Sequence, residues 1–299
     1  MRNVTRLSID SVPTNRLARL ALLAVAILWG SSLLVVKSTA EDVSPSLLIA
    51  LRFSIAALLL SVLLCKRFVR LGWKDWIGGA VTGLFLFGAH WIQTLGVTLA
   101  MPGKSAFLSS IYCVLVPFAV WLFSNIRPHV RNICAALMCT AGIMLASITE
   151  TFSVETGDLL ALLSGVFFAF HIAAVGKFSR NNDPAVMTAL QFIFCAVYAW
   201  VAVLFMDGIH PVFSMMAIPG ILYLALICTL LALLLQNIGQ KYTDSASASI
   251  LMSTESLFGT AFSVAFFGEK ITLQMLAGFV LIFISVLLSE LGGKHRNQS

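Results

Sequence analysis

Residues 244–272 read DSASASILMSTESLFGTAFSVAFFGEKIT, and this stretch decides the class of fold. Its apolar part, residues 245–267, is long enough to cross a bilayer, which takes about 20 residues. Glu255 lies near the centre of that run, where a charged carboxylate costs about 2.5–3.5 kcal/mol on insertion scales. The side chain therefore has to face protein or water rather than lipid. The stretch predicts a membrane-spanning helix with a polar group near the bilayer midplane.

The helical period sorts this stretch into two faces. Glu255 shares its side with Phe258 and Phe262, one and two turns further on, so aromatic rings flank the carboxylate. This setting is typical of a cavity wall and favours the protonated acid, which makes Glu255 a candidate for proton coupling or for binding a cationic group. The alternative is a structural Glu255 that pairs with an Arg or a Ser. The other face carries small hydroxyl residues that allow close helix packing: Ser245, Ser249, Ser253, Ser256, Thr260 and Ser263.

The composition extends the membrane assignment to the whole chain. Of the 299 residues, 59% are hydrophobic and 11% are charged, against about 25% charged in soluble domains. The mean hydropathy is +0.96. We therefore predict an all-α polytopic membrane protein with ten transmembrane helices joined by short loops, at residues 17–36, 45–65, 76–99, 104–123, 129–147, 158–176, 184–206, 217–238, 245–267 and 271–291.

The cysteines and the basic residues carry no signal for metal, cofactor or nucleic acid. All six cysteines lie in or at the ends of apolar runs and form no CxxC pair, so their ordinary role is that of small buried apolar side chains. No stretch interleaves basic and aromatic residues as a nucleic-acid-binding face would. We expect no metal site, no disulfide framework, no cofactor and no nucleic-acid partner.

The Lys and Arg residues determine the predicted orientation. With the N-terminus placed in the cytoplasm, the outer segments contain Lys37, Lys104 and Lys270, and Arg52 falls within a helix. All others of the 19 Lys and Arg residues fall in the inner segments, as the positive-inside rule requires. We predict a multi-pass protein of the cell (inner) membrane with both termini in the cytoplasm.

The two halves of the chain resemble each other weakly. Leu51-Arg52-Phe53 is echoed by Leu190-Gln191-Phe192, and Gln93-x-x-Gly96 by Gln236-x-x-Gly239. The spacing corresponds to five helices, an odd number, so the halves would insert with opposite orientation. Inverted repeats place a transporter's substrate site near the midplane between them. The predicted domains are an N-terminal cytoplasmic segment, two inverted five-helix repeats around a central cavity and a C-terminal tail, at residues 1–16, 17–147, 158–291 and 292–299.

Three motifs stand in the order and spacing of a known family: Trp29-Gly30-Ser31, Leu51-Arg52-Phe53 and Gly268-Glu269-Lys270. Together they resemble the EamA family of the drug/metabolite transporter superfamily, over essentially the whole chain. Pro117 matches the family's proline in the first half, whereas Ser256 stands where the family often has Pro after the Glu. The resemblance implies ten helices around a central cavity and transport of small metabolites, often amino acids and usually outward.

Further polar and amphipathic residues lie at membrane depth. Arg52 could snorkel outward, bind a substrate carboxylate or pair with a carboxylate of the protein, and we expect it to serve as a charge partner. His90 and His171 are either hydrogen-bonded core residues or substrate donors and members of a proton relay. Their counterparts in the other half are not polar, which favours a role in the site. The predicted substrate-binding set faces one central space and comprises Trp29, His90, Trp91, Tyr112, His171, Glu255 and Phe258.

These observations predict a secondary transporter, an exporter of small polar metabolites such as amino acids that works by alternating access. A gradient must drive it, since no nucleotide-binding part is found. The alternatives are efflux of drug-like or lipid-like compounds, a membrane-embedded enzyme, and a structural or receptor-like protein. We do not expect an enzyme, because a catalytic set at one depth is not evident. The expected partners are a small-molecule substrate and the lipid bilayer, with proton coupling at Glu255 as a candidate, in a monomer or homodimer.

Overall fold

The computed structural model describes residues 11–69, 71–100, 102–125, 127–147, 156–179, 182–208, 212–267 and 273–290. Within these ranges the chain is helical and contains no β-strand, apart from one isolated bridge between Val43 and Phe213. The elements are α1 (Ser11–Thr39), α2 (Pro45–Phe68), α3 (Trp73–Leu99), α4 (Pro102–Ser109), α5 (Tyr112–Ser124), α6 (Val130–Ser147), α7 (Thr156–Phe178), α8 (Pro184–Ala202), η1 (Val203–Asp207), η2 (Met215–Ala217), α9 (Ile218–Tyr223), η3 (Leu224–Leu231), α10 (Ala232–Tyr242), α11 (Ser245–Ser253), α12 (Glu255–Phe267) and α13 (Leu273–Glu290).

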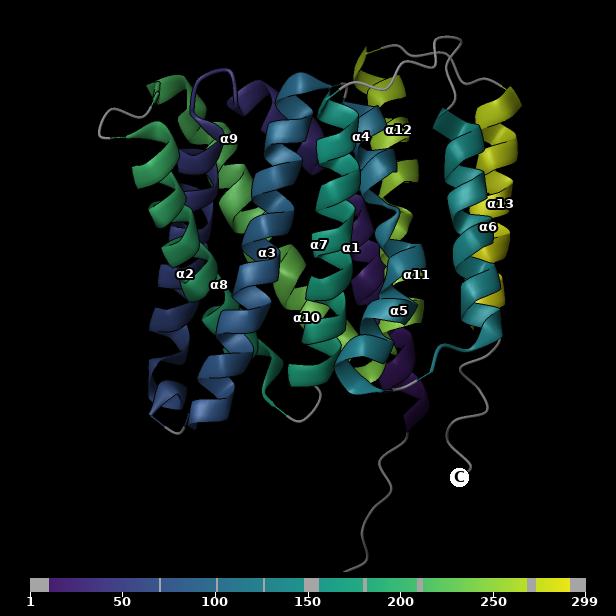
Figure 1. The fold of residues 1–299 in the computed structure, drawn as a ribbon, viewed down its shortest axis with the longest axis horizontal. Helices are drawn as coiled ribbons and strands as arrows, with labels where there is room; N and C mark the ends of the chain where they lie inside the picture. Colours follow the sequence, from purple (N-terminus) through teal and green to yellow (C-terminus); the bar gives the residue numbers. More distant parts are fainter. Residues whose placement is uncertain are drawn as a thin grey trace, which may run out of the picture.

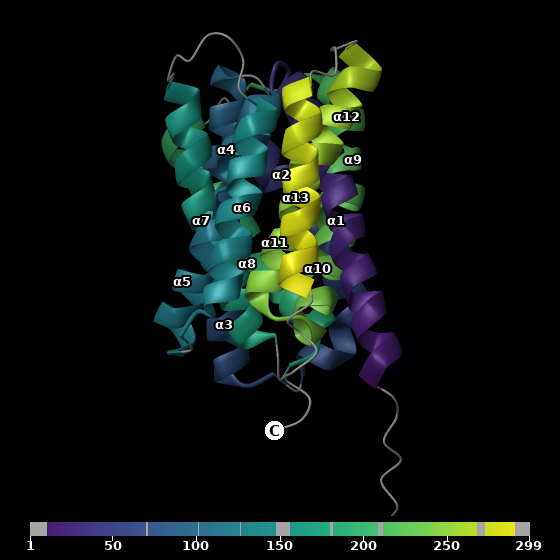
Figure 2. The same ribbon diagram turned by 90° about the vertical axis from the view of Figure 1, so that its right-hand side faces the viewer.

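Grouped across short breaks, these elements form ten helical segments that run along one common direction (Figures 1 and 2). Six runs in the described residues are long and apolar enough to cross a membrane: Arg16–Thr39, Pro45–Phe68, Trp73–Leu99, Thr156–Phe178, Pro184–Asp207 and Met215–Tyr242. Shorter apolar helices are Tyr112–Ser124, Val130–Leu145 and Leu276–Leu288. The predicted all-helical membrane fold is thus confirmed, with the first helix beginning earlier than expected.

Charge separates the two ends of the bundle. Helix α1 begins and α13 ends at the same end, the lower one in Figure 1. At the other end, Lys37 donates hydrogen bonds of 2.9, 3.1 and 3.2 Å to the carbonyls of Val97, Thr98 and Ala100, where the end of α3 carries partial negative charge. The helix ends at the lower end carry most of the described basic residues: Arg16, Arg19, Lys66, Arg67, Lys74, Arg127, Arg131, Lys177 and Lys241.

Two of the predicted helices are interrupted. The fourth, expected to be continuous over residues 104–123, consists of α4 and α5, which are separated by a turn at Ser110 and Ile111. The ninth, expected over residues 245–267, consists of α11 and α12, which are separated at Thr254. Packing of α4 on α12 and of α5 on α11 brings the two breaks together.

Hydroxyl side chains explain where these breaks fall. Ser109 and Ser110 both donate to the Ala106 carbonyl, at 3.1 and 2.8 Å. Ser253 donates to the Ile250 carbonyl at 2.8 Å, and Thr254 makes the same kind of bond one residue on. Such bonds compete with the main-chain ladder and bend helices. The second break therefore forms without a proline at the position after Glu255.

The eighth segment is not a regular α-helix. It contains a π-helical stretch, η3, between α9 and α10, and a second π-turn, η1, ends the seventh segment. Single π-turns inside helices occur often at functional sites. The sequence predicted only a continuous helix over residues 217–238, because no propensity rule distinguishes a π-turn from an α-turn.

Glycines allow the closest helix contacts. The GxxxG motif of Gly79 and Gly83 predicts close packing within the bundle, and the structure confirms it. A methyl group at Gly79 would lie 2.5 Å from Leu190 Cβ, and one at Gly83 would lie 2.9 Å from the Gln191 carbonyl oxygen. Gly142 lets α6 approach α13 in the same way, and these two helices stand side by side at one edge of the bundle (Figures 1 and 2).

Candidate functional site

Glu255 lies where the two interrupted helices meet. It is the first residue of α12 and is buried, with 6% of its surface exposed. Its carboxylate lies beside the hydroxyls of Ser110 and Tyr112, at the break between α4 and α5. The N-terminal ends of α5 and α12 therefore meet here, and helix N-termini carry partial positive charge that favours an anion. Paired half-helix ends of this kind form the ion and substrate sites of many transporters.

Gly30 fixes the distance between α1 and α12. A methyl group at this position would lie 2.7 Å from Phe258 Cβ, 2.8 Å from the Gly259 nitrogen and 3.0 Å from the Glu255 carbonyl oxygen. Two of these atoms belong to the backbone and cannot turn aside. The glycine therefore holds the start of α12, and with it the Glu255 side chain, close against α1.

Gly30→Ala is expected to lower the melting temperature of the purified protein by several degrees, since overpacking of this kind costs about 1–3 kcal/mol. Gly259→Ala in the same interface is the matched control. A methyl group there would find its nearest neighbour, the Gly30 carbonyl oxygen, at an ordinary 3.5 Å. Equal melting temperatures for the two variants would contradict the assigned contact.

Phe168 lies at the centre of a buried aromatic cluster. The centroid of its ring is 5.2 Å from that of His90, 6.0 Å from that of Tyr112 and 6.2 Å from that of Trp29. The His90 ring also lies 5.5 Å from Phe53. All these side chains are buried, and they come from five helices: α1, α2, α3, α5 and α7. The cluster connects the surroundings of Glu255, through Tyr112 and Phe168, to His90.

The indole of Trp29 is anchored on the π-helical segment. Its Nε1 donates to the Cys228 carbonyl at 3.1 Å. Two residues along α1, the Ser31 hydroxyl lies 2.7 Å from the Tyr223 hydroxyl. In η3 the ladder runs from residue i to i−5, and Cys228 belongs to that stretch. The Trp29-Gly30-Ser31 motif thus joins the eighth segment on one side and α12 on the other.

The two histidines are buried and incompletely hydrogen-bonded. His171 Nε2 lies 3.0 Å from Gln191 Oε1, whereas its Nδ1 has no hydrogen-bond partner among the described residues. His90 Nε2 likewise finds no partner in the part of the chain that the structure describes. Arg52 and His171 both lie within electrostatic range of His90. Buried polar atoms are nearly always hydrogen-bonded, so these nitrogens mark a place where further polar groups can bind.

Arg52 is not paired with Glu255. The side chain is 1% exposed, and its Nε donates to Thr229 Oγ1 at 2.8 Å. No carboxylate of the described residues lies within ion-pair distance of it. The two side chains are separated because Arg52 faces η3 and Glu255 faces the break between α4 and α5. The role of Arg52 as a charge partner stays a prediction.

Two of the predicted site residues lie at its margin. The Trp91 ring stacks on Phe87 with centroids 5.7 Å apart, and its Nε1 donates to Ser46 Oγ at 3.1 Å. It therefore contacts a different set of residues from its neighbour His90. Phe258 meets the site through its contact with Gly30. The remaining predicted residues belong to one connected region: Trp29, His90, Tyr112, His171 and Glu255.

Sequence reasoning missed Phe168, Gln191 and Thr229 as members of this region. Phe168 precedes His171 by one helical turn in a run of phenylalanines that gave no reason to choose among them. Gln191 occupies the position that corresponds to Arg52 in the other half, and this correspondence was a usable signal. Among the described residues, no group of three or more His, Cys, Asp or Glu side chains could hold a metal ion.

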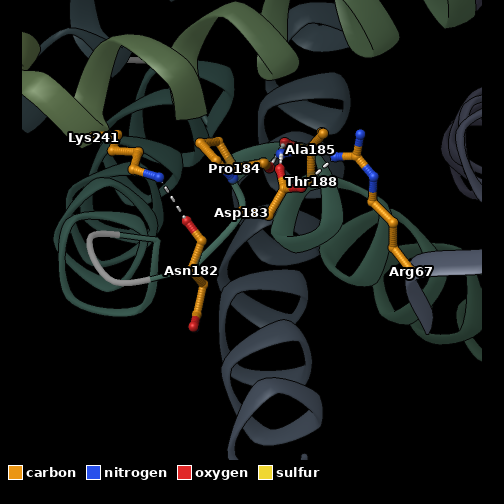
Figure 3. Close-up of polar contacts among 7 residues, drawn as sticks. All are labelled: Arg67, Asn182, Asp183, Pro184, Ala185, Thr188 and Lys241. Atoms are coloured by element: carbon orange, nitrogen blue, oxygen red, sulfur yellow. Dashed lines mark hydrogen bonds and ion pairs between the residues drawn. The ribbon is translucent and has the colours of Figure 1, made fainter. Parts of the chain in front are cut away.

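A separate pocket of about 480 Å³ lies at the basic end of the bundle. Beside it, Arg67 at the end of α2 forms an ion pair with Asp183, which also caps α8 by accepting a 3.0 Å bond from the Ala185 amide (Figure 3). Lys241 points to the Asn182 carbonyl at 3.1 Å. These contacts join α2, α8 and α10 at this end. The pocket is lined by Lys66, Arg67, Leu71, Asp75, Asn182, Asp183, Val186 and Met187.

Comparison with known proteins shows to which family the chain is related. The sequence pattern of the EamA-like transporter family matches residues 16–148 and again residues 155–291. An uncharacterized transporter of Archaeoglobus fulgidus is 31% identical over 92% of this chain and 86% of its own length. The uncharacterized transporter YvbV of Bacillus subtilis is 25% identical, over 93% of this chain and 92% of its own length.

A solved crystal structure of another protein has the same fold, with a TM-score of 0.74 at 21% sequence identity. The match covers 94% of this chain and 99% of the other. The two sequence matches to the family pattern together span nearly the whole chain, and the first of them includes the positions of Trp29-Gly30-Ser31 and Leu51-Arg52-Phe53. The chain therefore belongs to the EamA-like transporter family of the drug/metabolite transporter superfamily and is a multi-pass membrane protein.

Proposed function

We propose that the protein is a secondary transporter that exports small polar metabolites such as amino acids by alternating access. The observation that carries this proposal is the meeting of two interrupted helices at buried Glu255. Next to it lies an aromatic cluster with polar nitrogens that have no hydrogen-bond partner among the described residues. Interrupted helices near the midplane are how transporters expose backbone and side-chain groups to a substrate. The similarity to proteins described as transporters supports the same class.

We propose that residues 17–147 and 158–291 act as two inverted repeats around a central cavity. The packing partners support this arrangement. Helix α2 packs on α8 and α6 packs on α13, which pairs the second segment with the seventh and the fifth with the tenth. The packing of α3 on α7 is matched by that of α10 on α1. In the proposed arrangement, a two-fold axis in the membrane plane exchanges α2 with α8 and α6 with α13, and it relates the α3–α7 contact to the α10–α1 contact.

We propose that the basic end of the bundle faces the cytoplasm, with both termini there, in the inner membrane of the cell. In a variant lacking the native cysteines, Glu41→Cys is expected to react with an impermeant maleimide in intact cells. Arg127→Cys is expected to react only in inverted vesicles, since both side chains are exposed but lie at opposite ends. The opposite pattern would contradict this orientation. The native cysteines have to be replaced because Cys65 and Cys134 are exposed.

Counterflow in proteoliposomes tests the function. Vesicles that contain the purified protein and an unlabelled amino acid are expected to take up the same labelled amino acid transiently, at a rate well above protein-free vesicles. A panel of amino acids identifies the substrate. Absence of counterflow for every member of the panel would contradict export of amino acids.

Efflux of drug-like compounds is the second candidate. The rings of Trp29, Phe168 and Tyr112 form an apolar surface at the proposed site, which favours it. Transport of aromatic cations with no transport of amino acids would support this alternative. An enzymatic role has no comparable support, since the family and its relatives are described as transporters.

A further inference from the structure

Arg52 is a buried cation without a counter-charge among the described residues. Its side chain is 1% exposed and lies at membrane depth in α2. The Nε–H donates a hydrogen bond to Thr229 Oγ1, while Nη2 makes no hydrogen bond to any residue described. The thiols of Cys195 and Cys228 lie near the guanidinium, but a protonated thiol does not neutralise it. A buried charge without a partner is strongly unfavourable, so the site is poised for an anion.

Three other buried nitrogens lack partners within the described ranges. They are His90 Nε2, His171 Nδ1 and Gln191 Nε2, from α3, α7 and α8. His90 lies within electrostatic range of Arg52. Gln191 adjoins Phe192, whose ring centroid lies 5.8 Å from that of Phe53 next to Arg52.

The Gln191 amide is held by the bond between its Oε1 and His171 Nε2, at 3.0 Å. Because an amide oxygen only accepts, His171 Nε2 donates to Gln191, and Nδ1 of the neutral His171 ring is an acceptor. The Gln191 amide nitrogen donates, and His90 Nε2 donates in one of the two tautomers of its ring. Arg52 Nη2, His90 Nε2 and Gln191 Nε2 are therefore the donors that this region can offer to a bound group.

We propose that Arg52, with His90 and Gln191, forms the subsite that binds the carboxylate group of the transported substrate, and that His171 holds the Gln191 amide in place. A guanidinium has parallel N–H donors that match the two oxygens of a carboxylate, which an ammonium group cannot do. Arg52 Nη2 provides the free donor, and His90 Nε2 can add a second one. The inference rests on the proposed transport function and narrows its substrate class to compounds that carry a carboxylate.

The location of this subsite suits a transporter. Phe53, the neighbour of Arg52, carries the guanidinium over its ring at 5.3 Å and lies against His90 in the aromatic cluster. The cluster then continues through Phe168 to Tyr112. A bound molecule with its carboxylate at Arg52 would thus place its remaining part along these rings. The carboxylate of Glu255 lies beyond Tyr112 and does not compete for Arg52.

Matched acids and amides test the proposal, because they differ only in the group that Arg52 would bind. Protein in nanodiscs is heated with benzoate or benzamide, leucine or leucinamide, and phenylalanine or phenylalaninamide, and the concentration that gives half of the maximal stabilisation is measured. At least one acid is expected to act at a concentration roughly 10- to 100-fold lower than its amide, since a hydrogen bond to a charged group contributes that much to binding. Arg52→Gln is expected to abolish the preference and Arg52→Lys to weaken it.

Arg67→Gln is the control for a lost positive charge, since Arg67 is exposed at the basic end of the bundle. It is expected to keep the preference for acids. Equal action of acid and amide on the unmodified protein would overturn the proposal, and so would stabilisation by chloride as strong as by any carboxylate. The comparison on the unmodified protein decides the matter even if Arg52→Gln does not fold. If acids stabilise the protein but none of them is transported, the carboxylate subsite is supported and the proposed transport function is contradicted.

Discussion

Glu255→Gln is expected to keep substrate exchange across liposomes and to lose accumulation driven by a pH difference. We propose that Glu255 binds a proton in each transport cycle, because the neutral acid is the form that is least unfavourable at a buried site. For an exporter that exchanges protons for substrate, vesicles with an acidic interior should accumulate substrate as protons leave. With one proton per neutral substrate, one pH unit supports about tenfold accumulation. Gln keeps the size and hydrogen bonding but cannot titrate.

The groups that face Glu255 determine which other side chains could contribute to the pH dependence. Tyr112 is the titratable neighbour, and Ser110 is the neutral one. No basic side chain of the described residues forms an ion pair with Glu255, so removal of its charge does not strand a cation. Glu41→Gln, at an exposed position on the end of the bundle opposite the basic one, is the matched control and should keep full accumulation. Unchanged pH dependence in a well-folded Glu255→Gln protein would exclude the coupling role and support a structural one.

Phe168→Ala is expected to have the largest effect on stability. The ring is 4% exposed and contacts Trp29, His90 and Tyr112. Truncation of a buried Phe costs about 3–5 kcal/mol in protein cores, because the neighbouring side chains cannot close the cavity. Thermal unfolding in detergent measures the loss, and counterflow at a permissive temperature measures any change in substrate affinity.

Phe205→Ala provides the control for the same substitution on the outside of the bundle. Phe205 is 82% exposed in η1 and should tolerate truncation with little change in melting temperature. A Phe168→Ala protein that melts like Phe205→Ala would show that the aromatic cluster does not hold the helices together. Loss of transport without loss of stability would instead assign Phe168 to substrate contact alone.

The positions of the helices could be predicted from the sequence, because a membrane-spanning helix depends on residues that are consecutive in the chain. A run of apolar residues of bilayer length has few alternatives to a spanning helix, and the basic residues mark one end of each. Glu255 stood out for the same reason, since a carboxylate at that depth is costly. The glycines of the GxxxG motif predicted a close helix contact but not which helix makes it. In the structure that helix is α8.

The finer features depend on contacts between distant segments and could not be read from local patterns. The break at Thr254 forms without a proline, through hydroxyl groups that bond to the preceding turn. The π-turn in η3 gives no composition signal, yet it belongs to the stretch that meets Trp29 and Arg52. The neighbours of the two buried charges also depend on distant segments: Arg52 donates to Thr229, whereas Glu255 lies beside Ser110 and Tyr112.

The most direct test of alternating access is the exposure of the interrupted helices to each side of the membrane. Ser110→Cys, in a protein without other cysteines, places a thiol beside Glu255 at a site that is fully buried in this structure. Thr82→Cys, equally buried in the glycine contact between α3 and α8, is the control. We predict that an impermeant maleimide labels residue 110 from outside in intact cells and from inside in inverted vesicles, while residue 82 stays unlabelled. Labelling of residue 110 from one side alone, or from neither, would contradict the account.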